Sequence, residues 1–109
     1  MPQTHKVLGQ LYPATATSGT LYTVPSATQT ICSTLSICNT ASSSTSFRVA
    51  ICPTGEAVTS KNYLCYDSPI AANDSVLLTL GISLNQTDVV SIYANSGVVA
   101  FNLFGVEIT

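Results

Sequence analysis

Few side chains in this sequence can transfer protons, attack a substrate or bind a metal ion. The 109 residues include one histidine, five acidic side chains, three basic side chains and four cysteines. Acid–base and nucleophilic catalysis need such groups to converge at one site. The histidine, His5, lies in an N-terminal stretch punctuated by prolines, which is a poor place to hold a catalytic geometry. We therefore expect a protein that is not an enzyme, with no catalytic residue and no cofactor.

The four cysteines, Cys32, Cys38, Cys52 and Cys65, include no CxxC pair. With one histidine in the chain, a zinc site would need all four thiols, and we expect no bound metal. Cys32 and Cys38 fall on one face of one expected strand, about 20 Å apart, which is too far for a disulfide. The favoured interpretation is buried thiols that pack as small hydrophobic side chains. The alternative is a disulfide from Cys32 or Cys38 to Cys52 or Cys65, which a reducing cytosol disfavours.

Three aspartates border expected strands: Asp67 follows one strand, and Asp74 and Asp88 each precede one. The favoured interpretation is turn capping, because aspartate accepts hydrogen bonds from nearby backbone N–H groups. The alternative is a calcium site, for which clustered loops at one end of a sandwich could supply oxygen ligands. Arg48 is the one charge within a strand pattern, and its head group either reaches solvent or pairs with an acid across an interface.

The composition excludes several classes of partner. Charged residues make up 7% of the chain, whereas about 25% is typical. The formal net charge of −2 gives weak self-repulsion, so we expect a homo-oligomeric assembly subunit. Three basic residues cannot line a phosphate backbone, so we expect no nucleic-acid partner. No apolar run approaches the ~20 residues of a membrane span and no segment resembles a signal peptide. We therefore expect no membrane partner, and synthesis in a cytoplasm.

The stretch 45–52 (TSFRVAIC) shows the clearest strand pattern, because Phe47, Val49 and Ile51 alternate with Arg48 and Ala50. Similar short runs recur between turn residues, and no stretch of ten or more residues has the period and caps of a helix. The expected fold is all-β: a single sandwich of seven or eight short antiparallel strands, either jelly-roll or immunoglobulin-like. The other expected strands span residues 6–12, 21–24, 29–38, 62–66, 75–80, 89–94 and 98–104.

The chain divides at residue 28. We expect an extended N-terminal arm and edge strand over 1–28, and the β-sandwich domain over 29–109. The arm either lies on a neighbouring subunit or adds an edge strand to its own sheet, and both interpretations stay open. Gly9 marks a bulge or a close approach of two backbones.

Three further expectations concern the strands and turns of the sandwich. Ile31 and Leu35 should share one face of the strand 29–38. The run 75–80 is apolar on both faces, so both faces should be covered. Asn95–Gly97 should form a hairpin turn.

Four short motifs occur in order along the chain: YTVP at 22–25, FRVA at 47–50, KNYLCYDSPI at 61–70 and FGVE at 104–107. In this order they resemble a group of small structural proteins of tailed bacteriophages, over roughly residues 20–108. The resemblance implies a β-sandwich that is often trimeric, sits in the virion and has no enzymatic role.

The resemblance implies partners among virion proteins, foremost the major capsid protein, after synthesis in the host cytoplasm. The favoured function is a capsid cement or decoration subunit that stabilises the head. One alternative is a neck, tail or fibre-associated subunit. Another is a carbohydrate-binding adhesion module, with Tyr63 and Tyr66 as the candidate aromatic side chains. The expected interface residues are Val7, Leu8, Leu11, Tyr12 and Arg48.

Overall fold

The computed structural model describes residues 3–109, which form eight strands and two short 3₁₀ turns. The strands are β1 (Gln3–Leu11), β2 (Thr17–Thr23), β3 (Gln29–Asn39), β4 (Thr45–Cys52), β5 (Tyr63–Ile70), β6 (Ser75–Leu84), β7 (Val89–Ala94) and β8 (Val99–Ile108). The turns are η1 (Pro53–Gly55) and η2 (Ser60–Asn62), between β4 and β5. The all-β expectation is confirmed. Over residues 3–109, no helix is long and apolar enough to cross a membrane.

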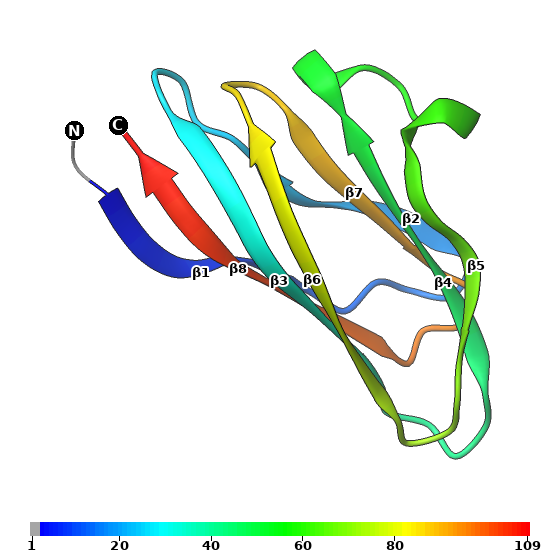
Figure 1. Cartoon of the computed structure of the whole chain (residues 1–109). Helices are drawn as coiled ribbons and strands as arrows, with labels where there is room; N and C mark the ends of the chain where they lie inside the picture. Colours follow the sequence, from blue (N-terminus) through cyan, green and yellow to red (C-terminus); the bar gives the residue numbers. More distant parts are fainter. Residues whose placement is uncertain (1–2) are drawn as a thin grey trace.

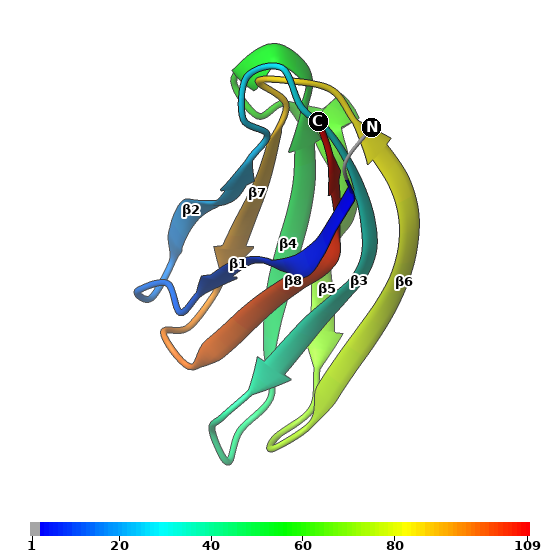
Figure 2. The same cartoon turned by 90° about the vertical axis from the view of Figure 1, so that its left-hand side faces the viewer.

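The strands form two four-stranded antiparallel sheets that face each other (Figures 1 and 2). Sheet A has the order β1-β8-β3-β6, and sheet B has the order β2-β7-β4-β5. A single long hairpin made from the whole chain would pair β1 with β8, β2 with β7, β3 with β6 and β4 with β5. All four pairs are neighbours in the two sheets, as they would be if that hairpin were rolled up. This order is a jelly roll. It decides between the two sandwich topologies that the sequence pattern left open.

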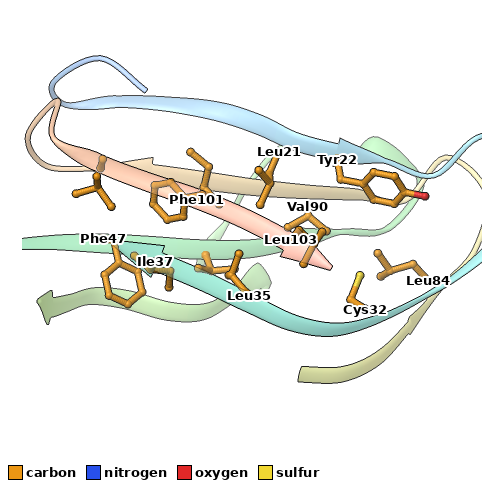
Figure 3. Packing of buried hydrophobic residues seen from close by; sticks show 14 of the residues in the cluster. Leu21, Tyr22, Cys32, Leu35, Ile37, Phe47, Leu84, Val90, Phe101 and Leu103 are labelled. Atoms are coloured by element: carbon orange, nitrogen blue, oxygen red, sulfur yellow. The ribbon is translucent and has the colours of Figure 1, made fainter. Parts of the chain in front are cut away.

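The core lies between the two sheets and is filled by alternate residues of their inner faces (Figure 3). Leu35, Phe101 and Leu103 come from sheet A, and Phe47 and Val90 come from sheet B. The rings of Phe47 and Phe101 meet edge to face across the sheets, with centroids 6.4 Å apart and planes at 74°. Such pairs add about 0.5–1.5 kcal/mol beyond the burial of their area. Apolar packing between the sheets therefore holds the sandwich together.

A bulge in β3 corrects the expected faces of that strand. Cys32 pairs with Gly105 and Thr34 pairs with Phe104, so Ser33 is an extra residue. An extra residue moves every following side chain to the other face of the sheet. Ile31 is consequently exposed, whereas Cys32 before the bulge and Leu35 after it both point into the core. The expectations that Ile31 and Leu35 share a face, and that Cys32 and Cys38 do, are therefore wrong.

The N-terminal segment is built into the sandwich. β1 pairs with β8 at the edge of sheet A, and β2 pairs with β7 at the edge of sheet B. This is the edge-strand interpretation of the expected arm, whose residues 1–2 lie outside the described part of the chain. The register shifts between Val7 and Gly9. A Cβ on Gly9 would lie 2.2 Å from the carbonyl oxygen of Leu21 on β2. The bulge and the close backbone approach expected near Gly9 are both present.

Three further expectations are corrected. β6 is an edge strand whose Leu77 is 69% exposed, so the run 75–80 is not covered on both faces within this chain. Asn95–Gly97 joins β7 in sheet B to β8 in sheet A, and is therefore a crossing between sheets and not a hairpin turn. β5 continues beyond residue 66, the expected end of this strand, through Pro69 to Ile70, because proline is tolerated on an edge strand such as β5.

Candidate functional site

Arg48 lies opposite a bulge in β5 that brings two partners to it. Phe47 pairs with Ser68 and Val49 pairs with Cys65, so Tyr66 and Asp67 both lie opposite the single residue Arg48. A bulge of this kind bends the strand and redirects its side chains. Asp67 adopts the left-handed backbone conformation at this point, with φ of 49°.

The guanidinium of Arg48 is fixed from several directions. Its Nε donates to Asp67 Oδ1 over 2.6 Å, and an Nη donates to Asp67 Oδ2 over 3.3 Å. Its central carbon lies 4.3 Å from the ring centroid of Tyr66 and 4.4 Å from that of Tyr93, which is its cross-strand neighbour on β7. The hydrogen bond to Asp67 is the main reason that the pKa of Arg48 lies above its ordinary value. Arg48 thus stays charged and is paired with an acid of its own chain, while its expected role at an interface stays a prediction.

Tyr63 completes an aromatic cluster on the outer face of sheet B. Its ring meets that of Tyr66 edge to face, with centroids 4.8 Å apart and planes at 73°. Tyr66 is 59% exposed. We call Arg48, Tyr63, Tyr66, Asp67 and Tyr93 the tyrosine–arginine cluster. Side chains from β4, β5 and β7 therefore form one surface that is apolar in the ring faces and polar in the head groups.

Two hollows adjoin the tyrosine–arginine cluster. One has a volume of about 240 Å³ and is lined by Arg48, Tyr63 and Tyr93 together with Ser18 and Val58, among others. The second has a volume of about 450 Å³ and is lined by residues 58–60 with Tyr63 and Tyr66. Val58 and Tyr63 line both, so the two hollows adjoin, and we call them together the groove.

The loop that forms the far wall of the groove is held by Asn62. The side-chain amide of Asn62 donates to the carbonyl of Ile51 over 2.8 Å and to Glu56 Oε2 over 2.9 Å. Its oxygen accepts from the backbone N–H of Thr59 over 2.7 Å. The hydrogen bond from Asn62 is the main cause that lowers the pKa of Glu56, so that this carboxylate stays ionised and bound. The wall that carries Val58 is consequently tied to β4.

All three basic side chains of the protein are paired with carboxylates. Besides the pair of Arg48 and Asp67, Lys6 Nζ lies 2.9 Å from Glu107 Oε1. Lys61 Nζ lies 3.4 Å from Glu56 Oε2. In the described part of the chain, every Lys and Arg side chain is thus paired with a carboxylate of the same chain.

The outer face of sheet A has a different character, because it carries no Lys, Arg, Asp or Glu among the outward-facing residues of β1, β8, β3 and β6. The side chains of Lys6 and Glu107 lie on the inner side of sheet A, because side chains along a strand alternate between its two faces. Each of the four strands contributes one exposed apolar side chain to this face, between 36% and 69% exposed. We call these four residues the apolar band: Val7, Phe104, Ile31 and Leu77.

The residues expected to form an interface are divided by the fold. Val7 belongs to the apolar band, and Tyr12 is 56% exposed, with its hydroxyl 3.1 Å from Thr40 Oγ1. Leu8 and Leu11 pack against the core. Arg48 lies on the opposite sheet. An anchor made of the four N-terminal residues would thus have half of its apolar side chains already used within the sandwich, and the interface role of the set stays a prediction.

Two of the aspartates, Asp74 and Asp88, cap turns. Asp88 accepts from the backbone N–H groups of Thr54 and Asn85, and Asp74 accepts from its neighbour Ser75, so their expected turn capping is confirmed. Over residues 3–109, no group of three or more His, Cys, Asp or Glu side chains could hold a metal ion.

The four cysteines are free thiols. Cys32 and Cys52 are buried, whereas Cys38 and Cys65 are partly exposed, so the expectation of four buried thiols holds for two. Burial raises the pKa of the Cys32 thiol to about 11. It also raises that of Cys52. These two thiols consequently stay protonated and unreactive at neutral pH.

Comparison with known proteins adds little beyond the fold. No protein-family model and no curated protein sequence matches this chain. Among solved structures, the chain is similar to part of the structure of infectious bursal disease virus, Gx strain, with a TM-score of 0.46 and 13% identity. The match covers 97% of this chain and 30% of that chain, so this protein spans less than a third of its length. A likeness at this level carries no argument about function.

Proposed function

We propose that this chain is a non-enzymatic structural subunit of a virion, most concretely a cement or decoration subunit on the head of a tailed bacteriophage. The observation that carries the proposal is the outer face of sheet A, which is uncharged and exposes the apolar band. The resemblance of the sequence motifs to small phage structural proteins supports the same role. The neck, tail or fibre of the particle is the alternative location.

The exposed fractions of the apolar band give an order of magnitude for the free energy gained when a partner covers it. Burying a Val, Leu, Ile or Phe side chain completely stabilises by about 1.5–3 kcal/mol. The band residues are 36–69% exposed, so covering them adds roughly 1 kcal/mol each. About 4 kcal/mol does not exceed the cost of association. The contact must therefore be wider than the band and include the flanking Ser, Thr, Asn and Gln side chains, as a homotrimer seam or a capsid surface would.

The β6 edge supports a contact on the same side of the molecule. The ten residues of β6 (SVLLTLGISL) include no charge and no proline, and one side of the strand has no hydrogen-bonded neighbour among residues 3–109. Natural proteins usually protect such an edge with charge, proline or a covering element. A partner that covers β6 would supply that protection.

The test compares two leucines that are similarly exposed on opposite sheets. Leu77→Lys places a charge in the apolar band, whereas Leu64→Lys, at a residue 48% exposed on β5, places the same charge on sheet B. We expect the parent chain and Leu64→Lys to form the same oligomer by light scattering and to sediment with particles that lack the chain. Leu77→Lys should lose both properties. If both variants behave like the parent chain, the apolar band is not the contact and the proposal loses its main support.

A second candidate function, a carbohydrate-binding adhesion module, is favoured by one observation. Tyr63 and Tyr66 lie side by side at a surface groove, as such a module would require. The test is binding of the isolated chain to a glycan array, and silence there would count against this candidate.

A further inference from the structure

The groove on sheet B is lined by the aromatic rings of Tyr63, Tyr66 and Tyr93 and by Arg48. The carboxylate of Asp67 lies beside the groove, where it accepts hydrogen bonds from Arg48. We infer that the tyrosine–arginine cluster binds a neutral oligosaccharide, with Tyr66 as the stacking platform and Asp67 as the acceptor for sugar hydroxyls. The inference rests on the second candidate function and names its site and its class of ligand.

The first argument is the rigidity of the platform. Arg48 donates two hydrogen bonds to Asp67 and lies within 4.4 Å of the ring centroids of Tyr66 and Tyr93. The ring of Tyr66 also contacts that of Tyr63 edge to face. Side chains that are already ordered lose little conformational freedom when a ligand binds. Tyrosine adds a large contact area with few rotatable bonds.

The second argument is the chemistry of the exposed groups. A pyranose ring has one face of C–H groups, which packs on an aromatic ring, and a rim of hydroxyls that both donate and accept. Tyr66 is 59% exposed, so part of its ring is open to a ligand although Arg48 lies over one face of it. The carboxylate of Asp67 is 46% exposed and has about four acceptor positions. Its two hydrogen bonds from Arg48 leave acceptor positions for the ligand, while tyrosine hydroxyls supply donors.

The third argument is charge. The two cations near the groove, Arg48 and Lys61, are each paired with a carboxylate, at 2.6 Å and 3.4 Å. A sulfated, phosphorylated or carboxylated sugar would therefore find no unpaired cation among the residues that line the two hollows, and the carboxylate of Asp67 lies beside the Arg48 head group that lines one of them. The groove therefore favours a neutral ligand over an anionic one.

The test begins with the full chain on an array of neutral and anionic glycans. We expect binding to neutral glycans only. The best-bound neutral glycan is then titrated into the ¹⁵N-labelled chain, where it should shift the amide signals of residues 63–67 and Tyr93. Binding to anionic glycans alone, no binding at all, or shifts confined to another surface would each overturn the inference. So would a proline-rich peptide that occupies the groove while no glycan does.

Three substitutions sharpen the test. Tyr66→Ala removes the platform and should raise the Kd for the glycan about tenfold, whereas Tyr66→Phe keeps the ring and should bind within about twofold of the parent. The matched control is Tyr12→Ala, at a tyrosine 56% exposed away from sheet B, which should leave the Kd unchanged. Equal losses in Tyr66→Ala and Tyr12→Ala would contradict the assignment.

The same variants separate this inference from the structural role. Tyr66→Ala should lose the glycan and keep the oligomer and the particle contact, because Tyr66 lies on sheet B and the apolar band on sheet A. Asp67→Asn leaves Arg48 without its carboxylate, so it should gain affinity for a uronate-containing glycan relative to a neutral one. No gain would show that Asp67 does not set the preference for neutral ligands.

Discussion

Tyr22 links the two sheets through its hydroxyl, and removing that hydroxyl should destabilise the protein in a pH-dependent way. Tyr22 lies on β2 of sheet B (Figure 3), and its hydroxyl donates to Glu107 Oε2 on β8 of sheet A over 2.5 Å. It also lies 2.8 Å from Thr30 Oγ1 on β3. A phenol has one proton, and Tyr22 uses it in the hydrogen bond to Glu107. The hydroxyl of Thr30 therefore donates to the oxygen of Tyr22.

The cost of Tyr22→Phe follows from these two contacts. A hydrogen bond to a charged group contributes about 1.5–3 kcal/mol, and a buried hydroxyl left without its acceptor adds about 1 kcal/mol. Thr30 is fully buried, and the side chain of Glu107 is 12% exposed. We therefore expect the free energy of unfolding to fall by about 3 kcal/mol at pH 7. Tyr12→Phe, at an exposed hydroxyl, should cost less than about 0.5 kcal/mol.

The pH dependence identifies the charged partner. The hydrogen bond from Tyr22, followed by the ion pair with Lys6, lowers the pKa of Glu107 in the folded state. A carboxyl group whose pKa is lowered by folding stabilises the folded state. This stabilisation is fully present above the unfolded pKa of about 4.3 and is lost as the pH falls through the folded pKa. The cost of Tyr22→Phe should thus shrink to about 1–2 kcal/mol once the pH has fallen below the lowered folded pKa of Glu107, where the bond to this residue becomes neutral.

Urea unfolding followed by circular dichroism, at pH 7 and at a series of lower pH values, measures the cost as Glu107 becomes protonated. A loss under about 0.5 kcal/mol at pH 7 would contradict the reasoning, and so would a loss that stays equal over the whole series.

Three other substitution or labelling experiments test the packing. Gly9→Ala should destabilise by at least about 2 kcal/mol, because its Cβ would meet a β2 backbone carbonyl at 2.2 Å. Gly19→Ala should cost less, since its Cβ would meet the end of a flexible leucine side chain at 2.8 Å. Phe101→Ala should cost about 3–5 kcal/mol in the same unfolding assay, because the ring is fully buried. A thiol reagent should modify Cys38 in the native protein but Cys32 only after unfolding, and equal rates would contradict the placement of the β3 bulge.

Local alternation predicted much of the fold. The bounds expected for β4 and β7 agree with the structure, because each is a short run with one apolar face between clear turn residues. The alternation of apolar and polar residues does not reveal an inserted residue. The bulge at Ser33 therefore reverses the expected faces of half of β3. The alternation does not reveal which strands become neighbours either, and the jelly-roll order and the exposure of β6 both follow from that choice.

The candidate site was predictable only in part, for the same reason. Tyr63 and Tyr66 were expected as a pair from their chemistry and their strand, and Arg48 was singled out as a charge within a strand. Their meeting depends on the two-against-one pairing in β5, which the spacing of residues does not reveal. Tyr93 was missed, because its contact with Arg48 exists only once β7 lies beside β4.

We propose that this protein is a structural subunit held on a virion through sheet A. The most direct test is an electron cryo-microscopy map of the intact particle that carries it. We predict density repeated over the shell at local three-fold positions, with the outer face of sheet A and the β6 edge covered and the groove of sheet B open to solvent. Density confined to a single vertex would contradict the cement role, and purified particles without the protein would contradict the claim as a whole.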